Sequence, residues 1–166
     1  MTAYPNRQRT PLINVGDSIT GIVLQEESNY FSMVTGREIL LTASGRVFSR
    51  APDTSKVFEY HGKISRIDFE KINAFIQEHD IRLKTYQDMN MDGSTISLRL
   101  HFKSNRAVSK SLYGDSRNQN FMYVFNEIEK LARPMLSNIV TITETDLQEL
   151  NAICRTQCYE NVNLVD

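Results

Sequence analysis

Several features that would assign this chain to a class of proteins are scarce or missing. It contains only two cysteines, Cys154 and Cys158, which lie one turn apart on a predicted helix and so cannot tie distant segments together. No histidine or further cysteine stands near them at the spacing of a zinc site. We interpret both as small apolar side chains in a reducing cytoplasm.

Long apolar runs and an excess of one charge are also missing. No stretch approaches the ~20 apolar residues that a membrane-spanning helix needs. The first ten residues lack the apolar segment of a signal peptide, so we expect a cytoplasmic protein, although a chain whose leader had been removed would look the same. The formal net charge of −1 argues against a DNA-coating protein and against a polybasic membrane anchor.

The length and composition indicate one soluble globular domain. The chain has 166 residues, of which 40% are hydrophobic and 23% charged, enough for one substantial core but cramped for two. We expect a flexible arm over residues 1–12, a single domain over 13–160 and a tail over 161–166. The chain shows no internal repeat and no low-complexity segment.

The clearest local pattern lies between residues 94 and 113. Apolar side chains alternate with polar ones from Ile96 to Lys103, which is the period of a half-buried strand. Turn residues follow over 104–106, and an extended pattern resumes over 107–113. The pattern predicts an antiparallel hairpin with one apolar face.

Other segments predict strands on the N-terminal side of this hairpin and helices around it. The predicted strands are 18–25, 30–34, 38–42, 46–50, 56–60 and 139–142, with turns at 26–29 and 35–37. The predicted helices are 65–80, with Ser65 as N-cap, then 120–133, and a third that begins near a Thr145/Gln148 capping box. We therefore predict an α+β fold, a mostly antiparallel sheet covered on one face by two or three helices.

The order of features over about residues 38–132 resembles an uncharacterised bacterial domain family that is often found on lipoproteins and small secreted proteins. The matching stretches are 39–48, 62–65 at a helix start, 86–92, 95–98 and 121–131. The resemblance implies a sheet with helices on one face and carries no known activity. The chain departs from the family by its missing lipoprotein leader and by the added residues 140–159.

One motif is typical of serine esterases. Residues 15–20, Val-Gly-Asp-Ser-Ile-Thr, resemble the block in which the serine, here Ser18, is the nucleophile. A nucleophilic serine needs a histidine base oriented by a third group. None of His61, His79 and His101 follows an acid by three positions, as the histidine of that family does. We therefore expect Ser18 to begin a strand, and an esterase remains a less favoured alternative.

A second motif is typical of calcium loops. Asp88, Asn90 and Asp92 place oxygen ligands at alternate positions before a glycine, as in the first half of an EF-hand loop. The position of the bidentate glutamate holds Arg99 instead, so we interpret the segment as a polar loop. Calcium binding is an alternative that the sequence leaves open.

The hairpin carries an acid-free basic stretch, and this is our candidate partner-binding surface. Its residues are Arg99, His101, Lys103, Arg106 and Lys110. We expect the first three to share the outward face of one strand. The sequence suggests no catalytic, cofactor-binding or metal-binding residue. The resulting hypothesis is a small non-enzymatic binding protein of the accessory, inhibitor or immunity type that acts on another protein. The alternative is a nucleic-acid-binding protein that uses the basic hairpin 99–110.

Overall fold

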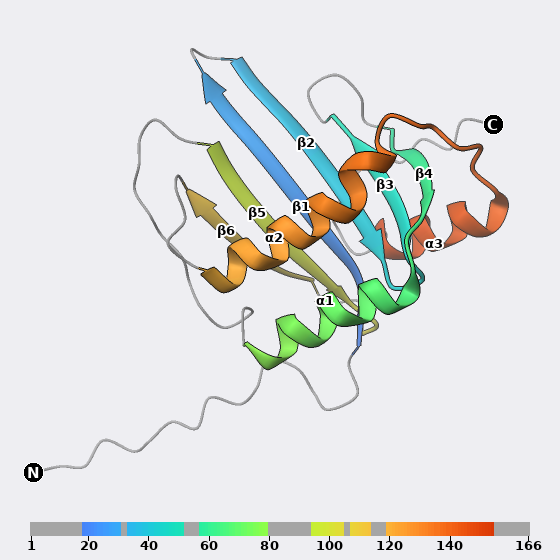
Figure 1. Ribbon diagram of the computed structural model, residues 1–166. Coiled ribbons are helices and arrows are strands. Elements are labelled where there is room, and N and C mark those ends of the chain that lie inside the picture. The colour runs from blue at the N-terminus through green and yellow to red at the C-terminus, as the bar shows by residue number, and fades with distance from the viewer. Residues whose placement is uncertain are drawn as a thin grey trace, which may run out of the picture.

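The computed structural model describes residues 18–30, 33–51, 57–79, 94–104, 107–113 and 119–154. Six strands form one sheet in the order β4-β3-β2-β1-β5-β6, and every neighbouring pair is antiparallel (Figure 1). The strands are β1 (Ile19–Tyr30), β2 (Met33–Thr42), β3 (Arg46–Arg50), β4 (Glu59–Lys63), β5 (Ser94–Phe102) and β6 (Ala107–Tyr113). The predicted α+β class and the predicted hairpin, β5–β6, are confirmed.

The long strands β1 and β2 correct the predicted meander. Turns were expected at 26–29 and 35–37, but β1 and β2 run unbroken through both segments, from Gly21 paired with Thr42 to Tyr30 paired with Met33. β1 is also paired with β5 on its other side, so its backbone groups are satisfied by two ladders, which outweighs the turn preference of its polar residues. Strand β4 continues through His61 and Gly62, where the sequence predicted its end.

Helices α1 (Arg66–Glu78) and α2 (Gln119–Ala132) lie across the same face of the sheet (Figure 1). Ser65 caps α1 as predicted, because its side chain accepts a hydrogen bond from the Ile67 amide at 3.2 Å. The apolar stripes of both helices meet the alternate apolar residues of the strands in the larger of two core clusters. That cluster includes Ile22, Leu24, Ile39, Leu41, Leu98, Leu100, Phe69, Ile76, Phe121 and Ile128.

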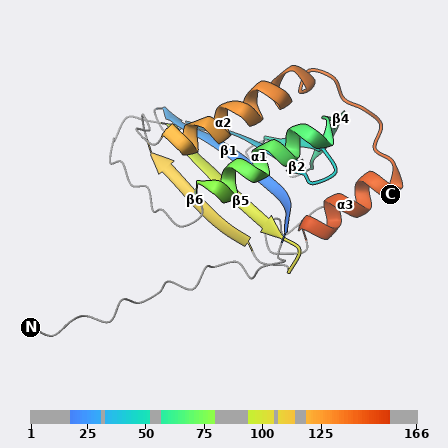
Figure 2. The same cartoon turned by 60° about the horizontal axis from the view of Figure 1, so that its bottom comes forward.

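Helix α3 (Glu144–Cys154) lies on the opposite face of the sheet (Figure 2). A second core cluster forms there from Val23, Leu40, Phe48, Phe58, Tyr60, Leu150 and Ile153. Gly21 makes this approach possible, because a Cβ at that position would lie 3.0 Å from Ile153 Cδ1 and 3.3 Å from Leu40 Cδ1. Two helices thus cover one face and the third covers part of the other.

A short 3-10 helix, η1 (Arg133–Met135), follows α2, and the chain then passes around the β4 edge of the sheet to reach α3 (Figure 2). We call residues 136–143 the edge strap. The sequence predicted a strand at 139–142, and this prediction is wrong, since the segment joins no ladder. In the described ranges, no helix combines the length and apolar character needed to cross a bilayer.

Candidate functional site

The β2–β3 turn is joined to α3 by a buried ion pair. Arg46 Nε donates to Asp146 Oδ1 at 2.6 Å, and both side chains are almost fully buried. Asp146 also accepts hydrogen bonds from the amide and the hydroxyl of Thr143, at 2.9 and 2.8 Å. Burial alone would raise the pKa of Asp146, but the bonds from Arg46 and Thr143 outweigh it and lower the pKa to about 2. The carboxylate is therefore ionised and engaged.

These contacts also correct the predicted start of the third helix. The capping box uses Thr143, whose hydroxyl accepts from the Asp146 amide at 3.3 Å, and not Thr145 with Gln148. Asp146 thus caps its own helix through one oxygen and anchors that helix to the sheet through the other. A single buried carboxylate fixes both where α3 begins and where it lies.

Glu149, one turn further along α3, is fixed by the same turn of the sheet. Its carboxylate accepts from the Ser44 hydroxyl at 2.8 and 2.7 Å and from the Arg46 guanidinium. Arg46 also donates to Ser44 Oγ at 2.6 Å. Both oxygens of Glu149 are consequently occupied, and Arg46 pairs with Glu149 as well as with Asp146.

A serine and a histidine form a buried pair between β3 and β4. His61 Nδ1 lies 2.8 Å from the carbonyl oxygen of Asn138, so this nitrogen carries the proton, and Nε2 accepts from the Ser49 hydroxyl at 2.6 Å. This tautomer is the one that a serine nucleophile requires of its base. However, Ser49 is 8% exposed and His61 is 3% exposed. The pair therefore has no room for a substrate carbonyl. Its bond to Asn138 instead holds the edge strap to the sheet.

The edge strap presents apolar side chains to solvent. Ile139 is 67% exposed, and Val140 and Ile142 are also exposed. The Val140 amide donates to the carbonyl of Tyr60 in β4 at 2.8 Å, while the amides of Ile139, Thr141 and Ile142 bond to nothing in the described part of the chain. The strap therefore covers the β4 edge and leaves a new apolar edge outside it.

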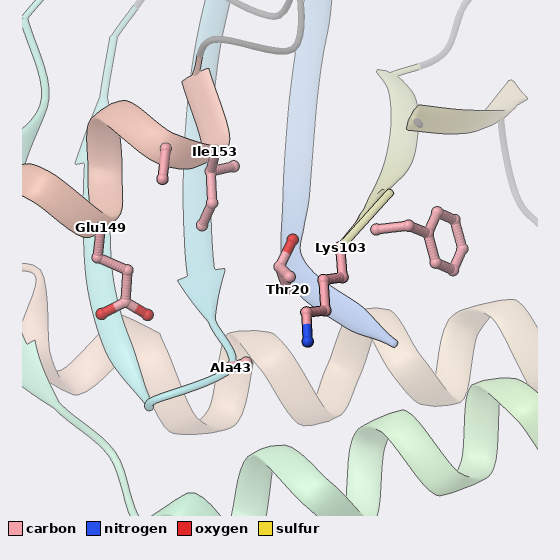
Figure 3. A pocket seen from close by; sticks show the side chains of 7 residues that line it. Thr20, Ala43, Lys103, Glu149 and Ile153 are labelled. Carbon is pink, nitrogen blue, oxygen red and sulfur yellow. The ribbon is translucent and has the colours of Figure 1, made fainter. Parts of the chain in front are cut away.

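A pocket of about 310 Å³ opens between α3 and the adjacent end of the sheet (Figure 3). Its lining residues come from the start of β1, the β2–β3 turn, the end of β5 and α3. They are Thr20, Ala43, Phe102, Lys103, Glu149, Ala152 and Ile153. The lining is mainly apolar, with one ammonium and one carboxylate on its walls. Neither the pocket nor the edge strap was anticipated from the sequence.

The structure separates the residues that the sequence grouped as a basic surface. His101 was expected to be exposed, but it is 1% exposed, and burial, followed by the charge of Arg99, lowers its pKa to about 4. Arg99 is half-buried and Lys103 is exposed at the pocket. Lys110 is paired with Leu98 and not with a polar residue of β5. Arg106 lies outside the described residues, and the partner-binding role of this group stays a prediction.

The two motifs considered as alternatives fall largely outside the described ranges. This applies to Asp88, Asn90 and Asp92 and to residues 15–17 of the esterase-like motif. Ser18 itself is exposed, and its carbonyl accepts from the Lys103 amide at 2.9 Å. Within the residues that the structure describes, no cluster of His, Cys, Asp and Glu side chains could hold a metal ion.

Comparison with known proteins adds no assignment to this geometry. No family model matches the chain, and no curated protein matches it.

Proposed function

We propose that this chain is a non-enzymatic binding protein that engages another protein along its edge strap. The observation that carries the proposal is the exposure of Ile139, Val140 and Ile142 on a segment already fastened to the edge of the sheet. Exposed apolar side chains that lie together are typical of interaction surfaces. An extended strand of the partner would cover them and continue the sheet outward.

The backbone of the strap supports strand addition. The Val140 amide bonds inward to Tyr60, and the amides of Ile139 and Thr141, which alternate with it along the segment, are available to the carbonyl groups of an added strand. The β-branched residues of the segment favour the extended conformation that such pairing needs. The pairing would therefore require little rearrangement of the strap.

The charge pattern indicates the chemistry of the partner. Residues 134–143 contain no charged side chain, whereas Arg133 and Glu144 flank them. An uncharged strand with β-branched apolar side chains would lose no ion hydration when it packs there. We therefore propose a partner strand of this composition, supplied by a different protein.

The other candidate functions have less support. The Ser49–His61 pair is closed to substrate, and it is held by a backbone carbonyl rather than by an acid. A nucleic-acid site on the hairpin would need a continuous basic face, but His101 is buried. The non-enzymatic protein-binding hypothesis is the one that these observations favour.

The test compares the wild-type chain with Ile139→Lys/Ile142→Lys and with Ile67→Lys as baits for a lysate of the native cells. Ile67 is a matched control, because it is 64% exposed on α1. We expect a partner protein to be retained by the wild type and by Ile67→Lys and to be lost with the double variant. All three proteins should melt at similar temperatures, because the replaced side chains are exposed.

Hydrogen exchange on the purified complex then locates the contact. The amides of Ile139 and Thr141 should exchange more slowly in the complex than in the free protein. Retention of the partner by the double variant would refute the proposal. Recovery of nothing but further copies of this chain would show that the strap pairs with itself, which also contradicts the proposed partner.

A further inference from the structure

The pocket beside α3 is independent of the edge strap and has the features of a small-molecule site. It encloses about 310 Å³, near the lower end of the range for ligand pockets. That space corresponds to about ten water-sized volumes, which suits a molecule the size of a short-chain fatty acid. Ile153 in the lining is almost fully buried, whereas the side chain of Phe102 belongs to the core cluster under α1 and α2.

Hydrogen bonds between separate segments fix the rim of the pocket. The Ala43 amide donates to the Thr20 carbonyl at 2.9 Å, and the Lys103 amide donates to the Ser18 carbonyl at 2.9 Å. The Thr20 hydroxyl donates to the carbonyl of His101 at 3.3 Å. Thr20 lies at the register shift between Ile19 and Gly21, where β1 has one residue more than β5. The rim is therefore largely preformed.

The wall that α3 contributes is also held in place. Glu149 is bound to Ser44 and Arg46, and Ile153 lies against the space left by Gly21. In Figure 3, Glu149 and Lys103 stand on opposite sides of the opening, with Thr20 and Ile153 between them. Glu149 pairs with Arg46, and no ion pair joins it to Lys103 among the described residues.

The charges on the walls are unequal in their availability. Both oxygens of Glu149 are engaged by Ser44 and Arg46, although Glu149 shares the single positive charge of Arg46 with Asp146. The Lys103 ammonium makes no hydrogen bond or ion pair with any side chain in the part of the chain that the structure describes. Lys103 is therefore the group on these walls that an anion would pair with, and the apolar side chain of Ile153 lines the same pocket.

We propose that this pocket binds a small aliphatic carboxylate, with the carboxylate on Lys103 and the aliphatic body against Ala43, Ala152 and Ile153. A protonated alkylamine would be repelled by the ammonium of Lys103. An alcohol would leave that ammonium without a counter-charge.

The experiment measures binding of acetate, hexanoate, dodecanoate, hexanol and hexylamine to the full chain by calorimetry. Methyl NMR spectra locate each ligand. Hexanoate should bind most tightly and shift the methyl signals of Thr20, Ala43 and Ile153. Lys103→Met keeps the aliphatic stem of the side chain and should weaken hexanoate binding about fivefold, as expected for a partly exposed ion pair, while leaving hexanol binding unchanged.

Two further variants complete the design. Ala152→Phe fills the pocket from an exposed position of α3 and should abolish the binding of hexanoate without lowering the melting temperature. Lys71→Met removes an exposed lysine from α1 and should change nothing. Equal affinity for hexanoate and hexanol, or wild-type affinity in Lys103→Met or Ala152→Phe, would overturn the proposal. So would methyl shifts confined to another surface.

Discussion

At the scale of single residues, two basic side chains at the end of one strand lie in different environments. His101 and Lys103 belong to one alternating row of β5 and its turn, yet His101 is buried and Lys103 is exposed. The row therefore does not act as one basic surface. Burial and the neighbouring Arg99 disfavour the protonated form of the His101 imidazole, because a positive charge is costly in a poorly hydrated site and next to a cation.

The protonation of His101 makes stability depend on pH. Its pKa is lowered from 6.5 to about 4 in the folded protein, so the unfolded chain binds the proton more tightly. The contribution of the neutral His101 side chain to the free energy of unfolding is fully present above pH 6.5. It is lost as the pH falls from 6.5 towards 4. The free energy of unfolding should be about 2 kcal/mol lower at pH 5 than at pH 7 from this group alone.

Urea titrations at both pH values check this prediction. His101→Gln should lack this change in the free energy of unfolding between pH 7 and pH 5. Arg99→Met should show a smaller change, because the neighbouring cation is gone. An unchanged difference in His101→Gln would show that the imidazole is not the group responsible.

At the scale of elements, two glycines have positive φ, one in the β2–β3 turn and one inside β4. Gly45 has φ +92° and Gly62 has φ +103°. A Cβ at Gly45 would collide with the carbonyl oxygen of Ile64, whereas the nearest atom to a Cβ at Gly62 is the flexible Met135 Cε at 3.4 Å. Both positions carry backbone strain for other residues, but only Gly45 adds a clash with the main chain.

We therefore predict unequal costs for the same substitution. Gly62→Ala should lower the free energy of unfolding by about 1 kcal/mol, the backbone term alone. Gly45→Ala should cost about 3 kcal/mol, because the β2–β3 turn must also move away from Ile64. Urea denaturation of both variants gives the comparison. Equal losses would mean that the main-chain contact at Gly45 relaxes without cost.

The elements also show what local sequence could and could not predict. Helix α1, helix α2 and the hairpin were predictable because their apolar residues repeat at the period of the element. Residues 26–29 have turn chemistry but lie within β1, whose ladders with β2 and β5 cannot be seen in the local sequence. Ile139 to Ile142 has strand chemistry, yet it forms a strap that bonds to β4 through the Val140 amide and the Tyr60 carbonyl without joining the ladder.

The candidate sites were harder to predict for the same reason. Lys103 was named from the sequence, but its pocket depends on Thr20 and Ile153, which are remote in the chain. The ion pair of Arg46 with Asp146 likewise joins residues that no local pattern connects. Alternation predicted which face of β5 is apolar, but it could not reveal that the other face buries His101.

At the scale of the whole molecule, the two faces of the sheet are protected unequally. The face under α1 and α2 carries the larger core cluster, whereas α3 covers a smaller one. Helix α3 should therefore open without the remainder of the protein unfolding. Leu150→Ala removes a side chain that is 2% exposed in the smaller cluster and should cost about 3 kcal/mol of local stability.

Hydrogen exchange separates local from global opening. In Leu150→Ala, the amides of α3 should exchange roughly a hundredfold faster, while those of β1 and β5 change little. Ile76→Ala, in the larger cluster, should accelerate exchange in the slowest strands instead. An equal acceleration of all amides in Leu150→Ala would show that α3 and the sheet unfold as one unit.

The long-range pairing of Arg46 with Asp146 has a consequence for synthesis on the ribosome. The two residues are separated by 100 positions, so a nascent chain that has emerged only as far as η1 holds a complete sheet and both helices of one face. Leu40 and Phe48 on the other face of the sheet are not yet covered by α3 at that stage. During that interval the emerging protein exposes an apolar surface, and a pause in synthesis while α3 is still inside the ribosome would favour aggregation or chaperone capture.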